Sequence, residues 1–247
     1  MIDLQKAYIS QAIYVASNEL DKRIRYKQEQ AEEAFSSFIS AQSQQTNLPD
    51  DFDPTQPRLI FQSGRKQMVI SQLASQLSLG FDSSDKGVIP QLDTVLKNVK
   101  EAHKKIEHFK GKENLKENAL VITISFPSTA SRSELSDFIF SRFLKMPKFG
   151  EIASSSVKSG YFLESGYFIN IETDVYEKRG GHVQVAAGTP IDIMSLPIIE
   201  IGISVKVDLN SKPKASEPGF TNNGPDEMIE IMNNYFPGEI YKLLDLA

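Results

Sequence analysis

The stretch from Pro57 to Phe81, PRLIFQSGRKQMVISQLASQLSLGF, limits most strongly what this chain can fold into. Apolar and β-branched side chains alternate there with polar ones, and Gly64 lies in the first connection, where a positive φ is useful. The pattern predicts three short strands at 58–62, 67–72 and 76–81. A meander of this kind has one apolar face, so the sequence also predicts helices packed on that face.

The first 45 residues contain neither glycine nor proline, and two interpretations of them remain open. In one, a single long helix runs from about residue 3 to residue 42, and part of its apolar stripe pairs with a partner. In the other, residues 7–16 form a strand and a helix follows, because Ile9, Ile13 and Val15 share one face at period 2. Both interpretations treat residues 1–45 as a mainly helical N-terminal segment.

The chain after the acidic loop 46–56 reads as one α+β domain over residues 57–247. The most hydrophobic strand, 119–126, is expected near the centre of the sheet and is expected to end at Pro127. Ser131 and Glu134 have the spacing of a capping box at the start of a helix. We expect a mostly antiparallel sheet of about seven strands with three or four helices on it. The remaining predicted helices are 88–109, 225–236 and 239–246, and the remaining predicted strands are 151–158, 161–163, 167–177 and 197–209.

Composition excludes several classes of site and location. The chain has 247 residues and a net charge of −5, so a general nucleic-acid-binding surface is not indicated. It has no cysteine, which removes disulfides, thiolate metal ligands and thiol nucleophiles. No apolar run approaches the roughly 18 residues of a membrane span, and the N-terminus lacks the pattern of a signal peptide. These features favour a cytoplasmic protein without a membrane partner.

Common catalytic and nucleotide-binding motifs are absent from the sequence. Neither G-x-S-x-G, G-x-G-x-x-G nor the P-loop pattern occurs, so no cofactor is expected. The three histidines give only weak evidence for a metal or catalytic site. His103 and Glu107 lie one helical turn apart, but the sequence shows no third metal ligand near them. His182 follows Gly180-Gly181 beside two basic residues, which suits a charged hairpin tip better than a phosphate site.

Glu172 and Asp174 are the best candidates for a metal site. They project from the same face of the predicted strand 167–177, about 7 Å apart by strand geometry. Such a pair could hold a divalent cation or act as an acid and a base. The simpler interpretation is that they form the solvent-facing half of an alternating strand.

Two further groups of residues are candidates for partner binding. The basic side chains of Arg65, Lys66, Lys145 and Lys148 would attract an acidic partner if they met on one surface. Aromatic side chains bracket two Ser-Gly turns at Tyr161, Phe162, Tyr167 and Phe168, and they either protrude as anchors or fill the core. The set that we predict to make partner contacts is Ile9, Ile13, Leu20, Ile24, Phe35, Phe38, Tyr161 and Tyr167.

The order of elements resembles that of a sporadically distributed, uncharacterised family of bacterial proteins of about this size. The matching pieces are ISQAIYV at residues 9–15, PRLIF with QMVISQLASQLSLGF, YFINIETDVY, and MIEIMNNYFPGEI at residues 228–240. The chain departs from that family in its stretched N-terminal segment and in having no tryptophan. The resemblance implies an accessory protein of the kind carried by mobile or defence gene clusters, and it supplies no catalytic residues.

The sequence therefore favours a non-enzymatic accessory or assembly subunit that self-associates or binds a larger protein partner, in the setting of bacterial defence. The first alternative is a divalent-metal-dependent hydrolase or nuclease that uses Glu172 and Asp174. The second alternative is a phage structural or assembly protein, which shares the prediction of protein contacts.

Overall fold

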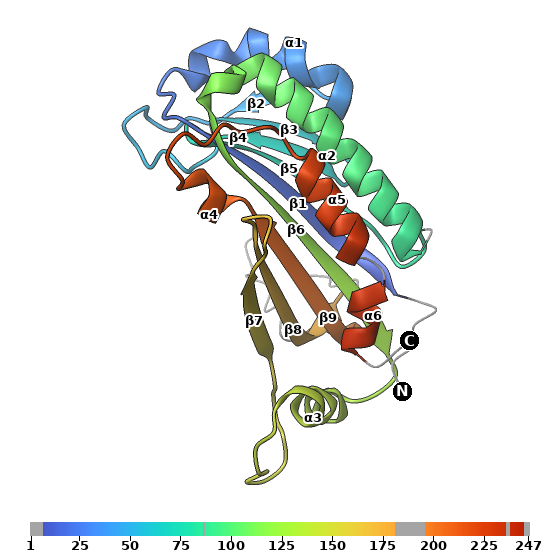
Figure 1. Cartoon of the computed structure of the whole chain (residues 1–247). Coiled ribbons are helices and arrows are strands. Elements are labelled where there is room, and N and C mark those ends of the chain that lie inside the picture. The colour runs from blue at the N-terminus through green and yellow to red at the C-terminus, as the bar shows by residue number, and fades with distance from the viewer. Residues whose placement is uncertain (1–6, 86, 181–195, 236–237, 245–247) are drawn as a thin grey trace.

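A single antiparallel sheet of nine strands organises the computed structural model, which describes residues 7–85, 87–180, 196–235 and 238–244 (Figure 1). The strand order is β2-β3-β4-β5-β1-β6-β9-β8-β7. The strands are β1 (Tyr8–Asn18), β2 (Ser43–Gln45), β3 (Leu59–Ser63), β4 (Lys66–Ile70), β5 (Ala74–Gly80), β6 (Leu115–Ser128), β7 (Val157–Phe162), β8 (Phe168–Arg179) and β9 (Ile198–Asn210). The prediction of an α+β fold with a mainly antiparallel sheet is confirmed, although the structure has more strands than the expected seven and more helices than the expected three or four.

Six α-helices and two short 3-10 helices complete the described part of the chain. The α-helices are α1 (Gln28–Ile39), α2 (Val88–Lys110), α3 (Arg132–Phe143), α4 (Lys212–Ala215), α5 (Asp226–Tyr235) and α6 (Gly238–Leu243). The 3-10 helices are η2 (Ile24–Lys27) and η3 (Lys112–Asn114). The capping box at the start of α3 forms as predicted, because Ser131 Oγ accepts from Glu134 N–H while the Glu134 side chain accepts from Ser131 N–H.

The N-terminal segment is a strand followed by a helix, so the alternative of one long helix is wrong. β1 lies inside the sheet and pairs with β5 on one side and β6 on the other. Its β-branched and aromatic residues gain two hydrogen-bonded neighbours there, which a free helix would not offer. The sheet also continues across the boundary that we expected between residues 45 and 57, because β2 before it pairs with β3 after it.

A β-bulge near the start of β1 changes which side chains are buried. The register with β6 shifts between Ile9 and Gln11, so residues on the two sides of the bulge no longer keep period 2. Ile9 is consequently buried on the same side as Ala12 and Tyr14. Ile13, which we expected beside Ile9, faces the other side of the sheet and is half-buried.

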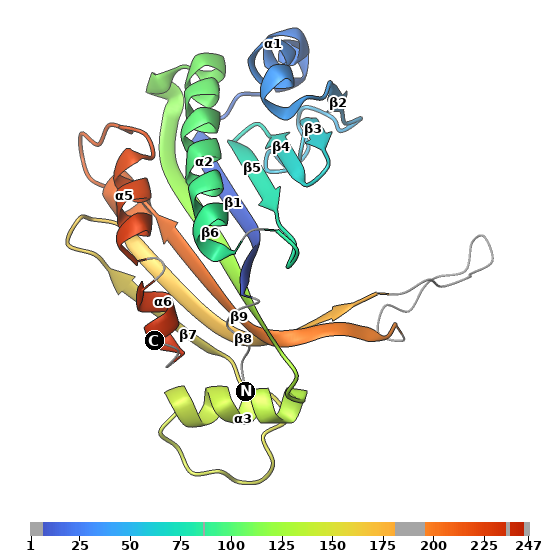
Figure 2. The ribbon, with the colours of Figure 1, turned by 90° about the vertical axis from the view of Figure 1, so that its right-hand side faces the viewer.

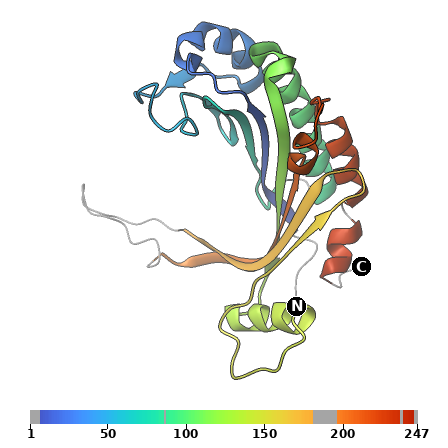
Figure 3. The ribbon, with the colours of Figure 1, turned by 60° about the vertical axis from the view of Figure 1, so that its left-hand side comes forward.

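The helices cover only one face of the sheet. Figure 3 shows the sheet curved, with α2, α5 and α6 along its convex side. The stripe predicted for the helix 88–109 is buried there, including Leu92, Val95, Val99 and Ile106. On the opposite, concave side the strands carry polar residues such as the exposed Gln11 and the half-buried Thr123, which lie opposite one another in the β1–β6 pair.

β6 lies near the centre of the sheet, as predicted, but it does not stop at Pro127. The strand continues to Ser128, and Pro127 lies opposite Gly202 of β9. Within the described residues β1 pairs with β6 only as far as Ser125, so the proline falls where β6 has lost one neighbour. Gly202 allows the close approach, because a Cβ there would lie 2.2 Å from Phe126 O.

The second half of the sheet ends at β7, the outermost strand (Figure 2). We expected separate strands at 151–158 and 161–163. The structure instead has one strand, Val157–Phe162, which joins the end of the first range to the start of the second and pairs with β8. Residues 151–156 are not in a strand. The alternation predicted for 167–177 is correct, since Ile169, Thr173 and Val175 are buried on the helix-covered face.

Candidate functional site

Two large apolar side chains are exposed along β7, at the edge of the sheet. Tyr161 is 52% exposed and Phe162 is 80% exposed, although both belong to a regular strand. The ring of Phe162 packs against Phe168 of β8, with 4.8 Å between the ring centroids. Large apolar groups held on a rigid strand and left open to solvent are typical of protein-binding surfaces.

A groove of about 420 Å³ lies beside these aromatic residues, between the sheet and the C-terminal helices. Its floor comes from β8 and its far wall from α5 and α6, so elements distant in sequence build one apolar surface. The residues that line it are Tyr161, Phe162, Leu163, Ile169, Ile171, Tyr235, Glu239, Ile240 and Leu243. Only one of these residues carries a charge, and the groove therefore suits an apolar partner.

On the outer side of β7, the backbone has hydrogen-bonding groups that no described residue pairs with. Leu163 N–H donates to Tyr167 O at 2.8 Å, so the backbone groups of Leu163 face β8. In an antiparallel pair this orientation alternates along the strand, which leaves the N–H and C=O groups of Phe162, Gly160 and Lys158 pointing away from β8. We call these outward groups, together with the side chains of Tyr161 and Phe162, the β7 edge.

Gly160 keeps the β7 edge flat at its centre. A Cβ at this position would lie 2.6 Å from Cζ of Phe168 and 3.0 Å from Oδ1 of Asn170. The aromatic ring of Phe168 therefore lies across the glycine, and a larger residue would displace it. This arrangement explains why a residue with low strand propensity occupies the middle of an edge strand.

Most of the residues that we predicted to bind a partner belong to the core. Ile9, Ile24, Phe35, Phe38 and Tyr167 are all buried. The apolar stripe of the N-terminal segment is consequently covered by the domain itself.

The remaining three predicted contact residues are accessible to different degrees. Leu20 and Tyr161 are exposed, and Ile13 is half-buried on the concave face. Of these, only Tyr161 lies in the apolar surface at the β7 edge. Phe162 is more exposed than Tyr161, and its place next to a predicted turn was the sequence signal for an exposed side chain.

Glu172 and Asp174 do share one face of β8, but each has another partner. Glu172 Oε2 lies 3.9 Å from Lys206 Nζ and 4.0 Å from Lys158 Nζ, so two ammonium groups flank this carboxylate. Asp174 Oδ1 accepts from the N–H of Val175 at 2.7 Å. Among the described residues no three His, Asp or Glu side chains gather in a way that could hold a metal ion.

His103 lies inside the core and takes part in a buried polar chain. Its Nδ1 is 2.6 Å from Tyr14 Oη, and Tyr14 donates to Asn118 Oδ1 at 2.9 Å. Nε2 of His103 lies 3.4 Å from Glu107 Oε1, the pair expected one helical turn apart. Burial lowers the pKa of His103, which favours the neutral ring. His182 lies outside the described residues.

The basic side chains do not gather on one surface. Arg65 pairs with Asp82 and Asp85, while Lys66 lies over the ring of Phe38, with 3.3 Å from Nζ to the ring centroid. Lys148, which follows α3, forms an ion pair with Asp137 within α3. Figure 1 places α3 and the β3–β4 hairpin at opposite ends of the molecule, so these cations do not form one patch.

Comparison with known proteins gives no family model, no curated protein and no solved structure that matches this chain. Of the helices in the described ranges, none combines the length and the apolarity that crossing a bilayer requires.

Proposed function

We propose that this chain is a non-enzymatic assembly subunit that self-associates through the β7 edge. The observation that carries the proposal is the combination, on one edge strand, of two exposed aromatic side chains with backbone groups that have no partner among the described residues. An open strand edge is a ready template for another strand, and folded proteins usually protect it with charges, proline or a bulge. β7 has no proline, and its one charged residue, Lys158, lies beside Glu172.

The opposite edge of the sheet is a poorer template. β2 has three residues, Ser43–Gln45, and all of them are polar. Its middle residue, Gln44, pairs inward with Ile60 of β3. A short polar edge offers little apolar area to a partner, so association is expected at β7 alone.

A second copy of the chain fits the β7 edge in a defined register. A two-fold axis perpendicular to the sheet keeps the helix-covered faces of both copies on one side. Residues that lie opposite each other must then belong to the same face, so their sequence numbers are both even or both odd. Placing the axis at Gly160 uses the outward groups of Lys158, Gly160 and Phe162 in both copies. Lys158 then lies opposite Phe162 of the other copy, where an ammonium group and an aromatic ring attract each other.

The same register also pairs residues on the helix-covered face. Ser159 lies opposite Tyr161 of the other copy, and the apolar grooves of the two copies become neighbours. Cross-strand pairs of this kind each contribute roughly 0.2–1 kcal/mol, and the two-fold symmetry makes each pair occur twice. The backbone hydrogen bonds and the cross-strand side-chain pairs therefore both stabilise the dimer, although the strand is short.

Replacing Phe162 with lysine is expected to raise the dissociation constant of the dimer at least about 100-fold. Each dimer loses two aromatic contacts and gains two pairs of like charges, because the new lysine lies opposite Lys158 of the other copy, and about 1.4 kcal/mol corresponds to a factor of ten. The measurement is sedimentation velocity over a dilution series of the full chain.

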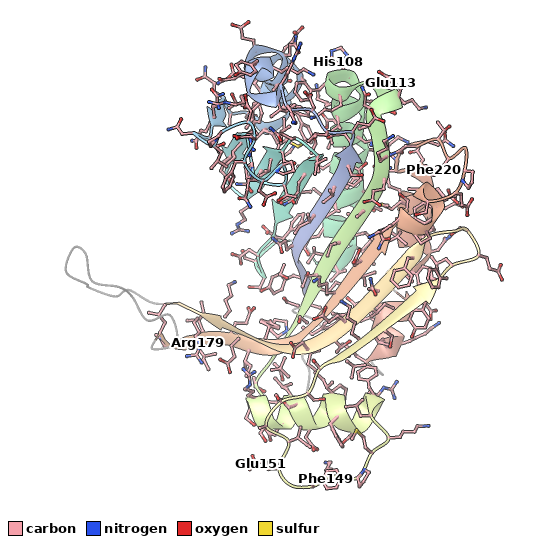
Figure 4. The ribbon with its side chains drawn as sticks, turned by 90° about the vertical axis from the view of Figure 1, so that its left-hand side faces the viewer. His108, Glu113, Phe149, Glu151, Arg179 and Phe220 are labelled. Carbon is pink, nitrogen blue, oxygen red and sulfur yellow. The ribbon has the colours of Figure 1, made fainter. Side chains whose placement is uncertain are left out.

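Phe149→Lys provides the matched control for this substitution. Phe149 is 91% exposed, and Figure 4 places it at the end of the loop that follows α3, far from the β7–β8 turn. This control is expected to associate like the wild type. Equal weakening by both substitutions would mean that general surface hydrophobicity, and not the β7 edge, drives association.

A further inference from the structure

A buried lysine lies at the C-terminal end of α2, next to the loop that follows β1. The side chain of Lys110 is 2% exposed, and within the described residues its Nζ has no hydrogen-bond partner. The nearest carboxylate oxygen, Oδ2 of Asp21, is 3.9 Å away. That oxygen already accepts from Lys27 Nζ at 2.8 Å. The buried amine is therefore held without a hydrogen bond of its own, which is uncommon for lysine.

Lys110 lines a cavity of about 230 Å³ that has mainly polar walls. The other lining residues are Asn18, Glu19, Leu20, Asp21, Lys27 and Asn114. This volume is below the usual range of about 300–1,000 Å³ for sites that bind drug-sized molecules, so the cavity suits a smaller one.

A second buried polar atom in the same cavity also lacks a partner. Asn18 Nδ2 donates to the carbonyl oxygens of Gln72 and Glu19, which fixes the orientation of the amide. Asn18 Oδ1 is left buried without a donor among the described residues. Two side chains that line the cavity, Asn18 and Lys110, thus each hold a buried polar atom without a partner among the described residues, and a ligand could satisfy both atoms.

The charges around the cavity favour a neutral ligand over an anion. Glu19, Asp21, Lys27 and Lys110 all line it, so two carboxylates balance two ammonium groups. Burial is the main cause that lowers the pKa of Lys110 to about 8, Asp21 opposes this shift, and Lys27 adds to it. A larger fraction of Lys110 is consequently the neutral, nucleophilic amine at neutral pH than for an ordinary lysine, whose pKa is about 10.4.

We propose that Lys110 forms a Schiff base with a small hydroxyaldehyde that enters this cavity. The neutral amine nitrogen bonds to the carbonyl carbon and loses one of its protons, which passes to the carbonyl oxygen and makes it the hydroxyl group of a carbinolamine. That hydroxyl takes a proton from solvent and leaves as water, which gives an iminium ion. The positive charge of the iminium lies next to Asp21, and the hydroxyl group of the aldehyde can donate to Asn18 Oδ1.

The proposal is tested by treating the full chain with glycolaldehyde and sodium cyanoborohydride at pH 7.5 and mapping the reduced adducts by mass spectrometry. Lys110 is expected to react at least about tenfold faster than Lys104, an exposed lysine on the same helix. The Lys110 rate should level off above about pH 8, following the pKa of this amine.

Two results would overturn the proposal. The first is a Lys110 rate equal to or below that of Lys104 in the folded chain. The second is selectivity that persists in 6 M guanidinium chloride, because the cavity and the lowered pKa exist only in the folded state. In that denaturant the ratio of the two rates is expected to fall to about one.

Discussion

Replacing Phe35 with alanine is expected to lower the free energy of unfolding by about 4 kcal/mol. The ring is fully buried and packs against two others, with 5.9 Å between centroids to Phe61 of β3 and 5.6 Å to Phe109 of α2. Removing it leaves a cavity between α1, α2 and the sheet that these rigid elements cannot close. Equilibrium unfolding in urea measures the loss.

Phe149→Ala is the control for this prediction, because the same side chain is removed from a fully solvated position and the change should stay within about 0.5 kcal/mol. Phe35 was one of the residues that the sequence suggested for partner binding. If Phe35→Ala kept wild-type stability and lost only the ability to associate, α1 would be a partner surface and the packing described here would be contradicted.

Replacing Arg58 with methionine is expected to cost about 3 kcal/mol of stability and to loosen the loop 46–56. Arg58 is completely buried, and its guanidinium donates to the backbone carbonyl oxygens of Gln56 at 2.9 Å and Phe52 at 3.0 Å. It also reaches Pro49 O and Asp53 O, both at 3.3 Å. Methionine would leave these acceptors without a donor. Urea unfolding measures the stability, and limited proteolysis reports on the loop.

Arg65→Met is the matched control for Arg58→Met. Arg65 makes two ion pairs, but its side chain is 55% exposed, and exposed pairs contribute between zero and about 1 kcal/mol. A loss at Arg58 no larger than the loss at Arg65 would show that the buried guanidinium does not hold the loop.

The parts of the fold that could be predicted are those in which local pattern and tertiary packing agree. The meander after Pro57 and the long helix 88–109 have clear periodicity and clear stop signals, and both are present. The N-terminus was ambiguous because it lacks glycine and proline, so length and turn signals could not separate a strand from a helix. The bulge at Ser10 was hidden as well, since a register shift depends on the neighbouring strand.

The candidate sites were predicted only in part, for similar reasons. Tyr161 was expected to contact a partner and is exposed, whereas Tyr167 has the same local surroundings in sequence and is buried. Strand order decides that difference, because β7 is the edge of the sheet. Lys110 was missed, although a signal existed: it follows Ile106 by four residues and so continues the buried stripe of α2.

The mass of the full chain in solution, measured by light scattering during size-exclusion chromatography, tests the central claim most directly. Association through the β7 edge predicts a mass twice the 27.6 kDa of one chain at micromolar concentration, and a single-chain mass for Phe162→Lys. A wild-type mass of 27.6 kDa throughout that range, the same as for Phe162→Lys, would contradict self-association of this protein.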